Sequence, residues 1–140
     1  MHAFYIPTPD FGLLKEKAET GDAKAQNDLG YHYSFGQDVT QNFVEAFRWF
    51  ELSAQQGFAE AQNNMARCYH YGRGVEKDLR QACVWYTKAA DQNDIDAVRS
   101  LFGMFKEFAM RPDQELLDFY NTAMRPNNIP HCGAEMSANA

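Results

Sequence analysis

The sequence predicts an all-α chain built as a short α-solenoid of helix pairs. Residues 18–53 and 54–89 repeat one another with a period of 36 residues, a spacing typical of stacked repeat arrays. Within each copy apolar residues recur at every third or fourth position, which is the period of a helix face. Glycine, asparagine and aspartate recur where such helices would begin and end.

The repeat is visible in identical residues that stand 36 positions apart. These pairs are Ala18 and Ala54, Gly21 and Gly57, Ala25 and Ala61, Gln26 and Gln62, Asn27 and Asn63, Tyr33 and Tyr69, Gly36 and Gly72, Val39 and Val75, Ala46 and Ala82, and Trp49 and Trp85. A third copy over residues 90–125 keeps Ala97, Leu101 and Phe105 in the apolar stripe but loses the turn sequence. Such divergence is typical of a terminal repeat, whose outer face meets water.

The elements follow in chain order. Residues 10–21 predict a short helix with Asp10 as N-cap, and Leu14 takes the place that Phe50 holds one repeat later. Each full copy then predicts two helices, because each contains two separate stripes of apolar residues. The stripes are Ala25, Leu29 and Tyr33; Phe43, Ala46, Phe47 and Phe50; Ala61, Met65 and Tyr69; and Leu79, Ala82, Cys83 and Tyr86.

Small and polar residues mark the expected helix ends. Gly36 and Gly72 would end the first helix of each pair in the left-handed conformation. Asn42 and Asp78 precede the second helices as N-caps. The equivalent residues after the second helices are Gly21, Gly57 and Asn93. Trp49 and Trp85 are expected at equivalent interfaces on the second helices.

Near the C-terminus, Pro112 is a plausible first-turn residue of one more helix, whose apolar stripe runs over residues 116–123. About seven helices are therefore expected. The predicted division is a lead-in with a capping helix over 1–17, three repeats over 18–53, 54–89 and 90–125, and a flexible tail over 126–140.

The Gly-x-Gly in "YHYGRGVEKD", residues 69–78, could instead be a phosphate-binding loop. The first copy reads "GQDVTQN" at the same place, and no strand pattern precedes it. The stretch is therefore interpreted as a connection between two helices, with Val75 in the core.

The pattern of residues 54–90 closely resembles the Sel1-like repeat, a relative of the tetratricopeptide repeat. Its elements are A-x-x-G, A-Q-x-N-x-A-x-x-Y, Y-G-x-G-V-x-x-D and A-x-x-W-Y-x-K-A-A. The resemblance covers residues 18–90 well and 91–125 weakly. It implies a right-handed superhelix of helix pairs whose members mostly serve as interaction scaffolds rather than as enzymes.

Composition narrows the function classes. The net charge of −6 and a pI near 5.1 argue against a nucleic-acid partner. Residues 1–60 carry nine acids and four bases (−5), and residues 61–140 carry ten and nine (−1). No apolar run is long enough to cross a membrane and no secretion signal is recognisable, so we expect a cytoplasmic protein.

No chemistry-bearing motif is found. Cys68, Cys83 and Cys132 are predicted to be reduced thiols, since their number is odd and their spacing suggests neither disulfides nor zinc. The four histidines share no metal-ligand spacing, and no nucleophile motif is present. No metal, cofactor or catalytic residue is predicted.

Binding is expected on the first helices, whose side chains away from the core stripe would line a concave groove. The candidate partner-binding residues are Lys24, Asn27, Tyr31, Phe35, Asn63, Arg67, Tyr71, Arg99 and Lys106; Ser34, Glu60, His70, Asp96, Gly103 and Glu107 share the row. Tyrosine, phenylalanine and arginine are common at binding hot spots. Asn27 and Asn63 could clamp a peptide backbone, whereas Phe35 and Tyr71 could alternatively pack between units.

Three functions stay open. The leading hypothesis is a non-catalytic module that binds a protein or peptide in the groove. A second is an acidic bacterial immunity or inhibitor protein that neutralises a basic toxin such as a nuclease. A third is a regulatory or structural subunit of a larger complex. The partner and the oligomeric state are not predicted.

Overall fold

The computed structural model describes residues 10–110, and these form six α-helices and no strand. The helices are α1 (Phe11–Glu19), α2 (Ala23–Phe35), α3 (Phe43–Gln55), α4 (Ala59–Tyr71), α5 (Leu79–Ala90) and α6 (Ile95–Met110). The predicted all-α helical repeat fold is confirmed. The predicted helix beginning near Pro112, the tail over 126–140 and Cys132 lie outside the described residues.

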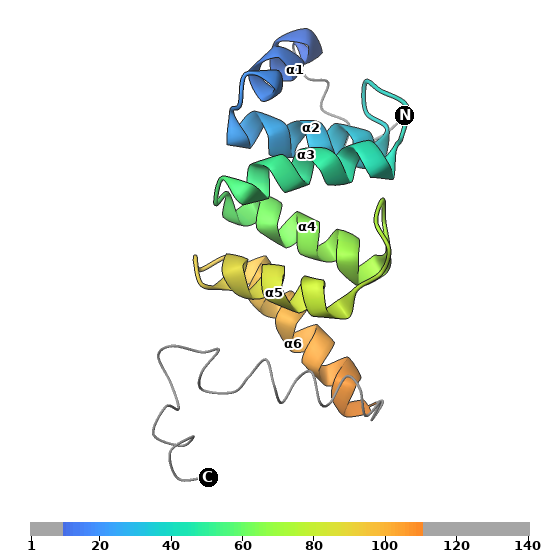
Figure 1. The fold of residues 1–140 in the computed structure, drawn as a ribbon, viewed down its shortest axis with the longest axis vertical. Helices are drawn as coiled ribbons and strands as arrows, with labels where there is room; N and C mark the ends of the chain where they lie inside the picture. The colour runs from blue at the N-terminus through green and yellow to red at the C-terminus, as the bar shows by residue number, and fades with distance from the viewer. Residues whose placement is uncertain (1–9, 111–140) are drawn as a thin grey trace. The chain divides into compact units, whose positions relative to one another are not determined.

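The chain divides after Leu101 into two compact units. In the first unit each helix packs against the next one in the chain, from α1 to α5, and Figure 1 shows these five helices as successive layers. The pairs α2 with α3 and α4 with α5 are the predicted helix pairs. Helix α6 begins in this unit and continues past its boundary.

Two apolar clusters lie between the layers. The first joins Ala18, Ala25 and Leu29, and Leu14 packs against it as expected for a capping helix. The second joins buried residues of α3 and α4, which are Ala46, Phe50, Ala54, Ala61, Met65 and Cys68. Trp49 packs on the first cluster and Trp85 on the second, so their predicted equivalence is confirmed. Both indoles are half-buried.

The predicted helix ends are also confirmed. Asp10, Asn42 and Asp78 each accept a hydrogen bond from a backbone N–H in the first turn of the helix that follows. Gly36 and Gly72 both have φ of +67° and close α2 and α4 in the left-handed conformation. Sequence periodicity therefore located the helix ends as well as the helices.

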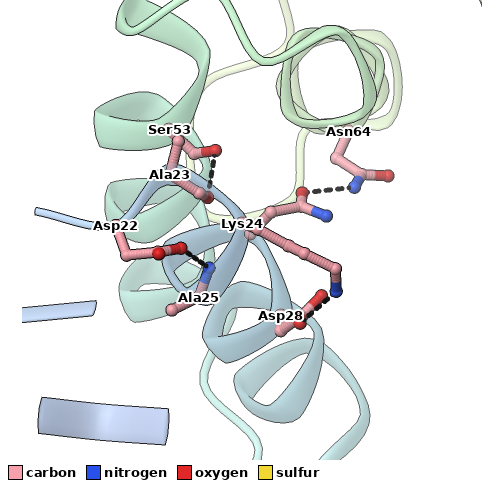
Figure 2. A network of polar contacts seen from close by, with 8 residues as sticks. Asp22, Ala23, Lys24, Ala25, Asp28, Ser53 and Asn64 are labelled. Atoms are coloured by element: carbon pink, nitrogen blue, oxygen red, sulfur yellow. Dashed lines mark hydrogen bonds and ion pairs between the residues drawn. The ribbon is translucent and has the colours of Figure 1, made fainter. Parts of the chain in front are cut away.

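Glutamine side chains tie each repeat to the one before it. Gln56 donates from Nε2 to the carbonyl oxygen of Gly21 at 2.9 Å and to Oε1 of Gln26 at 2.8 Å. Gln92 makes the same two bonds one repeat later, to Gly57 and to Gln62. Ser53 adds a 2.6 Å bond from α3 to the carbonyl oxygen of Ala23 on α2 (Figure 2). These polar contacts supplement the apolar clusters in fixing how consecutive helices pack.

The loop after α4 lies against the preceding repeat. Gly74 has φ of +74°, and a Cβ at this position would overlap the carbonyl oxygen of Phe43 at the start of α3. Val75 packs against the second apolar cluster, as predicted. The stretch 72–78 is therefore an inter-helix connection in close contact with the neighbouring repeat.

Candidate binding groove

The first helices carry two adjoining pockets, both within the first compact unit. One, called here the aromatic pocket, has a volume of about 270 Å³. Its lining residues are Tyr31, Ser34, Phe35, Gln41, Phe43, Phe50, Asn64, Arg67, Cys68 and Arg73. They come from both full repeats, namely from α2, α3, α4 and the two inter-helix loops. The pocket therefore exists only where the two repeats meet.

Tyr31 is the centre of the aromatic pocket. Its ring stacks on Phe35 with centroids 6.1 Å apart and meets Phe50 edge-on at 5.7 Å. Its hydroxyl donates to Oδ1 of Asn64 at 3.3 Å, and Nδ2 of Asn64 donates to Oδ1 of Asn27 at 2.9 Å; Figure 2 shows the amide of Asn64 making this second bond. Burial raises the pKa of Tyr31, so the hydroxyl is neutral at physiological pH.

Two guanidinium groups line the same pocket. Arg73 has its Cζ 5.3 Å from the Tyr71 ring centroid and 5.8 Å from that of Phe43, distances typical of cation–π contacts. Arg67 is exposed on α4. Among residues 10–110 neither group is recorded within 4.0 Å of a carboxylate. The aromatic pocket therefore presents two positive charges and has no acidic side chain among its own lining residues.

Cys68 forms part of the pocket wall and is a free, buried thiol. Burial raises its pKa to about 11, although the positive charges of Arg73 and Arg67 act in the opposite direction. A thiol with that pKa is uncharged at pH 7 and is therefore a poor nucleophile. Cys83 is likewise free and buried.

The second pocket, called here the polar pocket, crosses the three first helices α2, α4 and α6. Its lining residues are Tyr31, Glu60, Asn63, Arg67, Asp94, Asp96, Arg99 and Ser100. Three carboxylates and two guanidiniums thus face one hollow, and Arg99 lies 4.0 Å from Asp96. Asn63 is 5% exposed and its Oδ1 has no hydrogen-bond partner in the structure. Such an acceptor is suited to a donor supplied by a ligand.

Five predicted binding residues line these pockets. Tyr31 and Arg67 belong to both, Phe35 to the aromatic pocket, and Asn63 and Arg99 to the polar pocket. They converge because residues 36 positions apart occupy the same face of successive first helices. The alternative that Phe35 and Tyr71 pack between units is wrong, since they are 66% and 56% exposed.

Other predicted residues lie elsewhere. Asn27 is 0% exposed, so its predicted direct contact with a ligand is wrong. Its Oδ1 accepts a hydrogen bond from the side-chain amide of Asn64. His70 is buried and within 3.2 Å of the Tyr86 hydroxyl rather than in the groove. Lys24 pairs with Asp28 at 2.8 Å (Figure 2) and lines neither pocket.

Tyr71 also lines neither pocket, but its ring contacts the guanidinium of Arg73. Lys106 is exposed on the part of α6 that belongs to the second unit, and its role stays a prediction. Sequence reasoning missed Asn64, Phe43 and Arg73. The one signal for Asn64 was a second amide directly after Asn63, and its side chain bonds to Tyr31 and Asn27 of α2.

The described part of the chain holds no cluster of three or more histidine, cysteine or acidic side chains that could bind a metal ion. None of its helices combines the length and apolar character needed to cross a membrane.

Comparison with known proteins identifies the repeats. Residues 23–58 and 59–94 each match the model of the Sel1 repeat. These limits begin five residues later than the predicted 18–53 and 54–89 and keep the same period. Over 37 residues the chain is 51% identical to the secretory immunoglobulin A-binding protein EsiB of Escherichia coli. The matching stretch makes up 26% of this chain and 8% of EsiB.

Three solved structures share the fold. A protective antigen of uropathogenic Escherichia coli is 39% identical, with a TM-score of 0.68 over 71% of this chain and 21% of its own. A Sel1 repeat protein of Oxalobacter formigenes is also 39% identical, with a TM-score of 0.57 over 59% and 34%. Cysteine rich protein B of Helicobacter pylori, at 22% identity, shows likeness of fold alone, with a TM-score of 0.60 over 63% and 66%.

The chain thus spans a small part of EsiB and about a fifth to a third of the first two structures. Sel1 repeats are generally protein-interaction modules and are typically not catalytic. Since the two matched repeats make up half of its residues, the chain belongs to the Sel1 repeat family.

Proposed function

We propose that this chain is a non-catalytic module that binds a protein segment across the two pockets of its first-helix face. The observation that carries the proposal is the shared position of Tyr31 and Arg67, each of which lines both pockets. An extended segment that follows α2, α4 and α6 would meet these two side chains midway. Tyrosine and arginine are, with tryptophan, the residue types enriched among energetic hot spots.

The pocket walls support a binding role more than a catalytic one. The one nucleophile in the aromatic pocket other than hydroxyl groups is Cys68, whose pKa is raised to about 11 by burial. The contacts of Tyr31 with Phe35, Phe50 and Asn64 hold its ring in place before any partner arrives. Pre-ordered side chains lose less entropy on binding.

The test begins with site-specific photo-crosslinking in cells that produce the protein. A benzophenone amino acid at Phe35, which is 66% exposed in the aromatic pocket, should capture the partner. The same group at Leu52 on α3, which is 46% exposed and lines neither pocket, serves as the control.

Affinities of variants for the captured partner then decide the surface. Tyr31→Ala and Arg67→Ala should each weaken binding by more than about 1 kcal/mol. Arg48→Ala, an exposed arginine of α3 paired with Glu45, should leave affinity unchanged. If charge reversal at Glu45 or Glu51 weakens binding more than the groove variants do, the groove is not the site.

That opposite ranking would favour the alternative of an acidic inhibitor of a basic toxin, which rests on the net charge, the size of the chain and the lack of a recognisable secretion signal. A regulatory or structural subunit of a larger complex is the other alternative, and light scattering of the purified protein tests it. A cytoplasmic location is part of the proposal and is tested by cell fractionation.

A further inference from the structure

Resting on the groove-binding function proposed above, we propose a specificity for the aromatic pocket. The pocket takes a segment of a partner protein in which one aspartate or glutamate stands next to an aromatic or large aliphatic residue. The carboxylate would lie between Arg67 and Arg73, and its apolar neighbour would pack on Phe35 and Tyr31.

The charges of the residues that line the aromatic pocket favour an acidic group in the ligand. Ten residues line the pocket, and they include two arginines and no acidic side chain. Two arginines elsewhere in the described chain have carboxylate neighbours: Arg48 lies 2.9 Å from Glu45 and Arg99 lies 4.0 Å from Asp96. In a protein of net charge −6, two arginines that line one pocket with no acidic side chain among its lining residues form a local positive site. Guanidinium groups bind carboxylates with paired, charge-assisted hydrogen bonds.

The aromatic side chains of the same pocket favour an apolar residue next to that acidic group. Phe35 leaves 66% of its surface exposed, and its ring stacks on Tyr31 inside the same pocket. A large apolar side chain of a partner would cover this ring and gain both apolar burial and ring contacts. The pocket therefore offers an apolar shelf directly beside its positive charges.

Arg73 is held where it can serve this purpose. Its guanidinium lies over the rings of Phe43 and Tyr71, at 5.8 and 5.3 Å from their centroids. Rings on its flanks restrict the guanidinium without using up its N–H donors. The donors stay available to an incoming carboxylate.

The neighbouring polar pocket limits the ligand to a single acidic group. Glu60, Asp94 and Asp96 line it together with Arg67. A polyanion such as RNA, or an anionic membrane surface, would bring further negative charges against these carboxylates, where like charges repel. A protein segment with one acid beside an apolar residue avoids that repulsion.

The experiment pans a phage library of random dodecapeptides on the full chain and measures dissociation constants for synthetic versions of the enriched peptides. We expect the enriched peptides to share an acid adjacent to an aromatic or large aliphatic residue. Replacing that acid by its amide, or Arg73 by glutamine, should weaken binding about tenfold, as expected for the loss of a charge-assisted contact. Arg48→Gln is the matched control and should bind like the wild type.

A charge-exchange experiment distinguishes a change in specificity from a variant that fails to fold. Arg73→Glu should lose the acidic peptide and bind the same peptide better when its acid is replaced by lysine. Enriched peptides that lack an acid, or that bind Arg73→Gln as tightly as wild type, would overturn the specificity while leaving groove binding intact. Enriched peptides unaffected by Tyr31→Ala and Arg67→Ala would overturn the proposed function itself, and a library without enrichment would overturn both.

Discussion

The two complete repeats share their helices and caps but differ where the second lies against the first. Position 38 of the first repeat and position 74 of the second both have left-handed backbone, with φ of +62° and +74°. The first position holds Asp38, whose carboxylate lies 3.4 Å from the imidazole of His32. The second holds Gly74, packed on the backbone of Phe43. The turn itself thus tolerates a side chain, and contact with the preceding repeat is what requires glycine.

A second difference accompanies the first. The buried residue near the C-terminal end of the preceding helix is His32 in the first repeat and Cys68 in the second. Because the second repeat has Gly74 where the first has Asp38, it has no carboxylate at this position, and the equivalent of His32 is Cys68. The polar pair His32 and Asp38 of the first repeat is thus replaced in the second repeat by Cys68 and Gly74. His32 is buried beside the Phe11 ring of α1, with ring centroids 5.3 Å apart, whereas Cys68 packs in the second apolar cluster between α3 and α4.

The largest expected effect comes from Gly74→Ala. The methyl group would overlap the Phe43 carbonyl oxygen and would also occupy left-handed backbone. Destabilisation of about 2 to 5 kcal/mol is expected, measured by urea unfolding followed by circular dichroism. Asp38→Ala, at the equivalent position of the first repeat, should cost about 1 kcal/mol or less. Equal effects at the two positions would show that the turn, and not the contact, requires glycine.

Gly30→Ala should have the next largest effect. In a helix this change normally stabilises, but a Cβ at Gly30 would stand 2.5 Å from the Phe50 ring. A loss of about 1 to 3 kcal/mol is expected from overpacking. Phe50→Leu should recover part of that loss in the double variant. The second repeat holds Ala66 with Tyr86 at the same two positions, so a neutral result would mean that the two interfaces accommodate the methyl alike.

Loss of the glutamine contacts should have a smaller effect that is equal in the two repeats. Gln56→Ala and Gln92→Ala each remove two hydrogen bonds, to a turn carbonyl oxygen and to a glutamine of the preceding repeat. We expect each to cost about 1 kcal/mol, measured as a shift in the thermal midpoint. A much larger loss at one position would show that the repeats do not share this contact equally.

The smallest effect concerns pH. Burial raises the pKa of Cys68 from 9.0 to about 11, so the folded chain disfavours the thiolate. The stability gained from the neutral thiol is fully present below pH 9 and is lost as pH rises toward 11. Alkylation mapped by mass spectrometry should therefore be slow at Cys68 at pH 8 in the folded protein and fast in urea. Fast labelling at pH 8 without urea would contradict the assigned burial.

Much of this molecule could be predicted from its sequence because the 36-residue period relates each position to its equivalent. Asn42 and Asp78 were recognisable as caps from their positions alone, and the structure gives both that role. The same relation brought Tyr31 with Arg67, and Asn63 with Arg99, onto one face, since residues equivalent in the period share a side of their helices.

The errors arose where a side chain depends on a partner outside its own repeat. Asn27 has the spacing of an exposed position, but Asn64 of the next repeat covers it. Arg73 lies in a loop, where no helical period fixes the direction of the side chain, and its place over Phe43 and Tyr71 follows from tertiary packing. Local patterns carry no information about such neighbours.

The aromatic pocket has a wall from each of two consecutive repeats, with Phe35 on one and Arg73 on the other. Neither repeat alone encloses it, so the pocket belongs to the junction. A tandem duplication of one repeat would therefore add a junction as well as a repeat, and with it a second pair of walls for such a pocket.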